Sequence, residues 1–156
     1  MGPALVLDAN LIILLVVGSA SENAVLKHKR TRAYAIDDFR LLVGIISNYE
    51  KIVVAPNVLS EVSNLLSFEE DRLARQILVK FSSFITDASV DEKYVASATA
   101  SRRDEFRWLG LSDCALLELA KSEIHILTAD IGLHLAALKA GYHSVNFTHL
   151  IEAARA

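Results

Sequence analysis

Short apolar runs alternate with longer amphipathic stretches along the chain. The first run, Ala4 to Leu7, is followed at once by Asp8, Ala9 and Asn10. An apolar run of this length that ends in polar residues is typical of a strand buried on both faces of a parallel sheet. By the same pattern we expect further strands at 51–55, 84–86, 124–128 and 143–147.

Apolar residues at helical spacing fill the segments between these strands. The expected helices cover 37–49, 56–66, 69–81, 87–108, 113–120 and 133–140, and a short closing helix is capped by Thr148. Ser67 and Glu70 match a capping box, and Gly141 is a usual left-handed stop. The alternation predicts an α/β fold with three layers, α/β/α, around a central, mostly parallel sheet of about five strands.

Composition narrows the class of protein without naming a function. The 156 residues are 53% hydrophobic and 22% charged, and they contain no repeat or linker, so we expect one domain over 1–156. No apolar run reaches the ~18 residues of a membrane span, and no signal peptide is recognisable. The lone Cys114 favours a reducing, cytoplasmic location. A net charge of −3 argues against nucleic-acid binding by the whole surface.

Four acidic residues are expected to meet at one edge of the sheet. Asp8 and Asp130 end predicted strands, Asp113 opens a buried helix, and Glu61 follows another strand on the apolar side of its helix. Strand ends and helix starts share one edge in such folds, and this is where ligands bind. Acids crowded together there repel one another unless a cation binds them. Oxygen ligands favour Mg²⁺ or Mn²⁺, which supports phosphodiester chemistry.

Each acid also has a structural interpretation. Asp8, Asp113 and Asp130 all stand where a carboxylate caps or charges the start of a helix. Glu61 is harder to explain in this way, because an acid on the apolar side of a helix is uncommon. A metal site predicts that each carboxylate lies near the other acids, whereas a capping role predicts that it accepts a hydrogen bond from the backbone of its own helix.

Four short motifs carry a resemblance to a known family. They are Leu7-Asp8-Ala9-Asn10, Ser60-Glu61-Val62, Leu111-Ser112-Asp113-Cys114-Ala115 and Leu127-Thr128-Ala129-Asp130. In this order, and over essentially the whole chain, they resemble the PIN-domain nucleases. The resemblance implies a divalent-metal-dependent endoribonuclease that hydrolyses phosphodiester bonds of single-stranded RNA, as in toxins of the VapC type.

The same resemblance implies roles for individual residues. Asp8, Glu61, Asp113 and Asp130 would be the catalytic metal ligands for Mg²⁺ or Mn²⁺, and Asn10, Thr128 and Ser112 would support them. It further implies a homodimer or higher homo-oligomer, and an antitoxin protein as a partner. The chain departs from the family's pattern at two points. Ala9 stands where the family commonly has Thr or Ser. The first two acids, Asp8 and Glu61, are 53 positions apart (61 − 8).

Basic residues are candidates for contact with RNA. Six of them fall in two clusters: Lys27, Lys29, Arg30, Arg32, Arg102 and Arg103. Lysine and arginine bind phosphates without sequence preference. Solvated surface charges, or salt bridges within a helix, explain the same clusters equally well.

Two other functions remain open at this stage. A phosphatase or phosphoryl-transfer domain would use Asp8 as nucleophile, although the haloacid-dehalogenase pattern places a second Asp where this chain has Asn10. A non-catalytic PIN-like module would bind RNA or protein, although such modules lose the acids that this chain retains.

Overall fold

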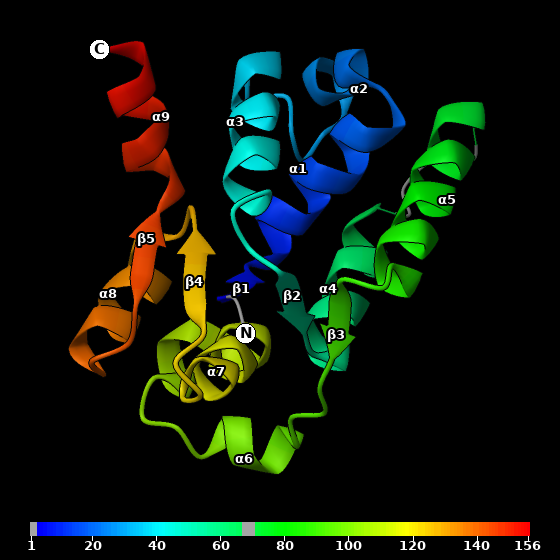
Figure 1. Cartoon of the computed structure of the whole chain (residues 1–156). Helices are drawn as coiled ribbons and strands as arrows, with labels where there is room; N and C mark the ends of the chain where they lie inside the picture. The colour runs from blue at the N-terminus through cyan, green and yellow to red at the C-terminus, as the bar shows by residue number, and fades with distance from the viewer. Residues whose placement is uncertain (1–2, 67–70) are drawn as a thin grey trace.

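The computed structural model describes residues 3–66 and 71–156 (Figure 1). Its strands are β1 (Ala4–Leu7), β2 (Lys51–Val54), β3 (Val90–Glu92), β4 (His125–Thr128) and β5 (Ser144–Asn146). Its helices are α1 (Ala9–Ala20), α2 (Glu22–Lys27), α3 (Ile36–Ile46), α4 (Pro56–Leu66), α5 (Arg72–Thr86), α6 (Ser97–Ser101), α7 (Phe106–Ala120), α8 (Ile131–Lys139) and α9 (Phe147–Arg155).

The strands form one parallel sheet in the order β3-β2-β1-β4-β5. The central strand β1 pairs on one side with β2, where Leu5 lies opposite Ile52. On the other side it pairs with β4, and there Leu7 lies opposite Leu127. This sheet, with helices around it, confirms the predicted α/β fold. It also places the ends of β1 and β4 next to each other.

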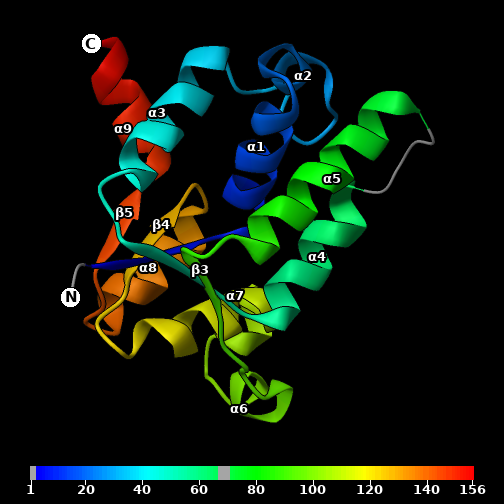
Figure 2. The ribbon, with the colours of Figure 1, turned by 45° about the vertical axis from the view of Figure 1, so that its right-hand side comes forward.

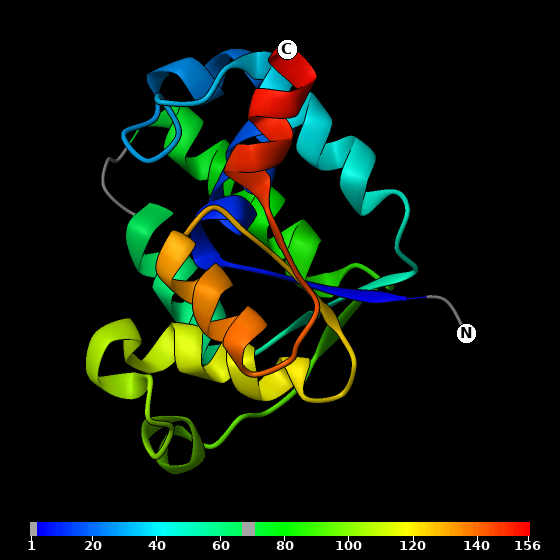
Figure 3. The ribbon, with the colours of Figure 1, turned by 90° about the vertical axis from the view of Figure 1, so that its left-hand side faces the viewer.

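Helices cover both faces of the sheet. In Figure 2, α1, α3 and α5 lie above the sheet and α7 lies below it. Helix α8 packs against β4 and β5. Figure 3 shows β1 running from the N-terminus toward the side where α4, α7 and α8 gather. The carboxyl end of β1 therefore lies on the side of the sheet where these three helices are found.

The core is centred on β1 and α1. Leu5, Val6 and Leu7 are at most 1% exposed, and most of α1 is equally buried because α3, α4 and α5 surround it. Gly18 allows α3 to approach closely, since a Cβ there would lie 2.1 Å from Cδ1 of Phe39. The buried interior is what holds the end of β1 in place.

Two predicted elements between β2 and α7 were wrong. Residues 84–86 belong to the end of α5, not to a strand, because Phe81, Phe84 and Ile85 continue the helical spacing of the apolar side. The segment 87–108 is not one helix. It contains β3, an irregular stretch, the short α6 and the start of α7. Asp87 ends α5 and accepts hydrogen bonds from the backbone and hydroxyl of Ser89.

The helix ends are set by several specific residues. Gly141 adopts φ 82°, as its predicted role as a left-handed stop requires. The closing helix α9 is capped by Asn146 and not by Thr148, because the Asn146 side chain accepts from the backbone of Thr148 and His149. The predicted capping box at Ser67–Glu70 lies outside the described residues.

The end of the chain is tied to α3. Arg155 of α9 donates to both carboxylate oxygens of Asp38 at 2.9 Å, and Asp38 also accepts from the backbone of Ala35. Within residues 3–66 and 71–156, we find no helix with the length and apolar character needed to cross a lipid bilayer.

Candidate functional site

Asp8 stands at the end of β1 and is only 4% exposed. Its Oδ1 accepts a hydrogen bond from the backbone of Leu11 at 2.8 Å, which caps α1. Its Oδ2 accepts from the hydroxyl of Thr128 and from the backbone of Ala129 at 3.0 Å. Burial raises the pKa of Asp8, the three hydrogen bonds lower it, and the charge of Asp130 raises it again.

Thr128 joins two of the predicted acids. Its hydroxyl donates to Asp8 and accepts from the backbone of Asp130 at 2.9 Å. Thr128 therefore contacts both Asp8 and Asp130 through its hydroxyl. The other two expected supports are placed differently: Asn10 is exposed and Ser112 is half-buried, and the described residues give neither a side-chain hydrogen bond.

Asp130 begins α8. Its Oδ1 accepts from the backbone of Leu133 at 3.0 Å, so this carboxylate caps the helix while it lies at the exposed edge. A Cβ at Gly132 would lie 3.1 Å from that same oxygen and 3.5 Å from Cδ2 of Leu109. The small residue leaves room for the carboxylate and brings α7 against the first turn of α8.

Asp113 lies in α7, one turn after a break in that helix. Gly110 has φ 81° and ψ −172°, a conformation that favours glycine, and the second part of α7 begins after it. The sequence had indicated a turn and a helix start at this point. Asp113 is half-buried and makes no hydrogen bond with the described residues. Burial, followed by the charges of Asp130, Asp8 and Glu61, raises its pKa to about 7.

Glu61 lies on α4 and is exposed, so its expected place on the buried side of this helix was wrong. The buried side is formed by Val58, Leu59, Val62 and Leu66. Glu61 stands at the border of that side, where tertiary packing decides exposure. Its charge nevertheless acts on Asp113. The four predicted acids therefore share one electrostatic environment although they come from four separate segments.

The acids suit a hard divalent cation in donor type and in charge. Carboxylates that are crowded together are stabilised by a positive ion between them. In the arrangement described for residues 3–66 and 71–156, no three acidic, histidine or cysteine side chains stand close enough together to hold a metal. Asp8 and Asp130 are held in place by the hydrogen bonds with which they cap α1 and α8.

The first basic cluster lines a cavity of about 540 Å³ between α2 and α5. Lys27, Lys29 and Arg32 contribute its cations, and Leu66 at the end of α4 contributes to its floor. Arg30 is exposed beside it, and its backbone donates to Nδ1 of His28. Since Glu61 is on the same helix as Leu66, five residues earlier, the cavity stands about 8 Å along α4 from that acid.

The second basic cluster divides into two kinds of residue. Arg102 is exposed and lines a cavity of about 340 Å³. Arg103 has a side chain only 12% exposed, and its guanidinium pairs with Glu105 at 2.9 Å and with Glu118 at 2.5 Å. Arg103 is thus engaged by the protein's own acids.

Tyr34 is a site residue that the sequence did not single out. It is half-buried and packs against Phe147, with ring centroids 6.1 Å apart. Burial, together with the charges of Asp8 and Asp38, raises the pKa of Tyr34 to about 12, so its phenol keeps its proton beside the acids. An aromatic residue two positions after Arg32 gave no periodic signal that would have identified it.

No protein-family model matches this chain, and no curated protein matches it.

Proposed function

We propose that this protein is a divalent-metal-dependent endoribonuclease that hydrolyses phosphodiester bonds of single-stranded RNA, with the four acids as its site. The observation that carries the proposal is the environment of Asp113, whose pKa is raised to about 7 by burial and by Asp130, Asp8 and Glu61. These acids come from four segments of the chain, and we expect them to be the ligands that the PIN-domain resemblance implies. A purely structural role for the four does not explain this repulsion.

Helix capping accounts for only part of the acidic set. Asp8 and Asp130 each cap a helix, and their hydrogen bonds would keep their carboxylates in fixed orientations. Asp113 and Glu61 cap nothing within the described residues. Helix capping therefore does not explain why Asp113 and Glu61 stand at this edge, and a functional role would.

The metal would be Mg²⁺ or Mn²⁺, held by Asp8, Glu61, Asp113 and Asp130. When bound, such an ion polarises the scissile phosphate and neutralises the charge that develops on it. Asp113 or Glu61 would orient the attacking water or accept its proton at a carboxylate oxygen. Tyr34 would offer a protonated phenol at the same edge.

A phosphoryl-transfer role for Asp8 is disfavoured by its hydrogen bonds. Both oxygens of its carboxylate accept from neighbouring groups, and the residue is 4% exposed. A covalent nucleophile needs a free oxygen that approaches the phosphorus directly. We therefore favour a role in which Asp8 holds a cation and does not attack.

The proposal includes partners and a location that rest on the resemblance. They are a second copy of the chain, an antitoxin protein and a cytoplasmic setting. Sedimentation equilibrium of the purified chain measures the first of these, and a monomer at every concentration would remove the homodimer from the proposal.

The function is tested with a labelled pool of single-stranded RNA, and single-stranded DNA in parallel, in EDTA, Mg²⁺ or Mn²⁺. Asp113→Asn is the decisive variant, because Asp113 supports no described hydrogen bond and the change should leave the fold intact. Glu152→Gln, an exposed acid on α9, is the matched control. We expect metal-dependent cleavage by the wild type and the control, and a loss on the order of 100-fold or more in Asp113→Asn.

Cleavage by Asp113→Asn at the wild-type rate would refute the site assignment. Absence of both cleavage and metal binding in the wild type, measured by calorimetry, would favour the non-catalytic module instead.

A further inference from the structure

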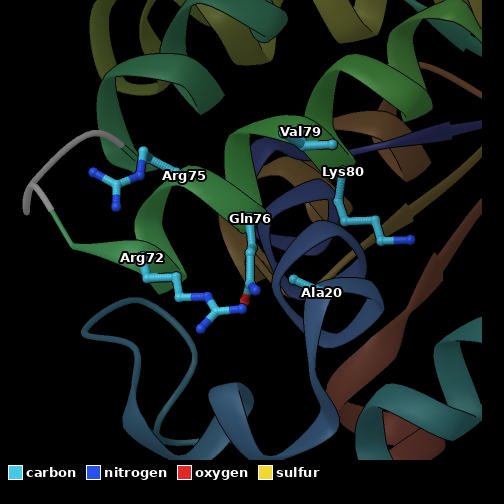
Figure 4. Close-up of a pocket in the computed structure, with 6 residues that line it drawn as sticks. All are labelled: Ala20, Arg72, Arg75, Gln76, Val79 and Lys80. Carbon is cyan, nitrogen blue, oxygen red and sulfur yellow. The ribbon is translucent and has the colours of Figure 1, made fainter.

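Helix α5 carries a row of basic residues on its solvent side. Arg72, Arg75 and Lys80 line a cavity of about 400 Å³, and Gln76 and Val79 lie between them. Ala20, at the end of α1, closes the cavity from the other side (Figure 4). These positions repeat every three to four residues, so they share one side of the helix. Figure 4 shows their side chains spread along the cavity, with Arg72 and Arg75 at one end and Lys80 at the other.

These cations differ from three other arginines of the protein. Arg40, Arg103 and Arg155 all pair with carboxylates at 3.0 Å or less. By contrast, Arg72 and Arg75 make no ion pair or side-chain hydrogen bond with any described residue, and the same holds for Lys80. The nearest acid along the helix, Asp71, is occupied as the cap of α5, where it accepts from the backbone of Ala74. The charge on this side of α5 is therefore available to an external anion.

A second cationic cavity adjoins the first across α5. The cavity of about 540 Å³ is lined by Leu73, Ala74 and Ile77 of the same helix, opposite Lys27 and Arg32. Basic hollows thus flank the first turns of α5 on both sides. In a chain with a net charge of −3, this concentration of positive charge marks one restricted surface.

We propose that α5 binds the phosphates of single-stranded RNA outside the acidic edge and so holds the substrate strand on the protein. The inference rests on the proposed function. Arginine forks match phosphate geometry. From Arg72 to Lys80 the helix rises about 12 Å, a length of about three stacked nucleotides. Val79, which is 64% exposed, offers apolar surface between the cations for a sugar or base.

The test is fluorescence anisotropy of a labelled 20-nucleotide RNA in EDTA, over a series of salt concentrations. The variant is Arg72→Gln/Arg75→Gln, and the matched control is Lys51→Gln/Lys139→Gln, which removes two exposed charges elsewhere. We expect the α5 variant to lose affinity on the order of tenfold. Its plot of log K against log salt should be less steep by about 1.4, as two lost phosphate contacts predict.

A third variant guards against a trivial loss of folding. Arg72→Lys/Arg75→Lys keeps both charges, and we expect it to retain the wild-type salt slope. Equal affinity in the α5 glutamine variant and the wild type would overturn the proposal, as would an equal loss in the control. A less steep dependence of log K on log salt in the lysine variant would overturn the proposal too. The positive charges of α5 would then not be what binds the phosphates.

A competitor identifies the class of ligand. Polyglutamate at matched charge should displace the RNA less well than unlabelled RNA does. Equal displacement would assign the surface to an acidic protein partner and overturn the inference. Cleavage assays separate this result from the proposed function. RNA binding that depends on α5, without cleavage, would refute only the nuclease, whereas cleavage with binding independent of α5 would refute only this inference.

Discussion

The acidic edge and the basic side of α5 are built in opposite ways. The acidic edge draws one residue from each of four distant segments, and its central carboxylate is buried and hydrogen-bonded on both oxygens. The basic side draws most of its residues from one helix, and they are exposed and without described partners. The first depends on the whole sheet, whereas the second depends only on local helical spacing.

This contrast teaches what each region should tolerate. A change at Asp8 removes contacts that hold separate elements together, so stability and function should fall together. A change on α5 removes charge and little else, so function should fall alone. Four measurements can break or sharpen this distinction.

The largest effect is expected at Asp8. Asp8→Ala leaves the backbone N–H groups of Leu11 and Ala129 and the hydroxyl of Thr128 without their acceptor. We expect the free energy of unfolding, measured with urea, to fall by about 3 kcal/mol. Asp130→Ala, which loses the single described bond to Leu133, should cost about 1 kcal/mol. An equal cost for both variants would contradict the central position of Asp8.

Asp113 should give the protein a pH dependence. Its pKa is about 7 in the folded state against an ordinary 3.8, so the folded state holds the proton more tightly. The free energy of unfolding should therefore fall as pH rises from about 4 to about 7, and then level off. We expect this term to be roughly 2 kcal/mol after allowance for partial exposure. It should be absent from Asp113→Asn, and identical pH profiles would exclude the repulsion.

Arg103 tests whether an arginine of the second basic cluster is structural. Arg103→Met removes the partner of Glu118, whose side chain is 10% exposed, and of Glu105. We expect a loss of roughly 1–2 kcal/mol in urea unfolding, with RNA affinity within about twofold of the wild type. A selective loss of RNA affinity would place Arg103 with the α5 residues instead.

The smallest effect is expected at Arg75. Arg75→Gln should change the free energy of unfolding by less than about 0.5 kcal/mol, because the side chain is exposed and has no described partner. Thermal unfolding of this variant beside the wild type measures the effect. A loss above about 1 kcal/mol would show that the basic side of α5 also supports the fold.

The fold and part of the site were predictable because strong local patterns specify them. Buried apolar runs that are followed by Asp8 and by Asp130 predicted two of the central strands. Glu61 was misplaced because Val58 and Val62 define a buried side of α4 whose border a sequence does not locate. Residues 84–86 were misassigned because β-propensity there opposed a helix that packing extends.

Other features could not be seen without the folded chain. The charge of Asp8 acts on Tyr34, which lies in the segment between α2 and α3, and no periodicity in the sequence indicates this relation. The cavity on α5 needs Ala20 opposite Gln76, and these residues are more than fifty positions apart. The helix that supplies its cations had been recognised only by its apolar side.

The bond between Thr128 and Asp8 spans 120 residues and so has a consequence for synthesis. At 5–20 residues per second, Asp8 emerges roughly 6–24 s before its partner exists. Until β4 is made, β1 lacks one of its two neighbours in the sheet, and Asp113 and Asp130 are not yet all in place. Under the proposed function, the growing chain cannot cleave its own messenger RNA while the acids are incomplete. Under that function, activity begins only after Asp130 has been made.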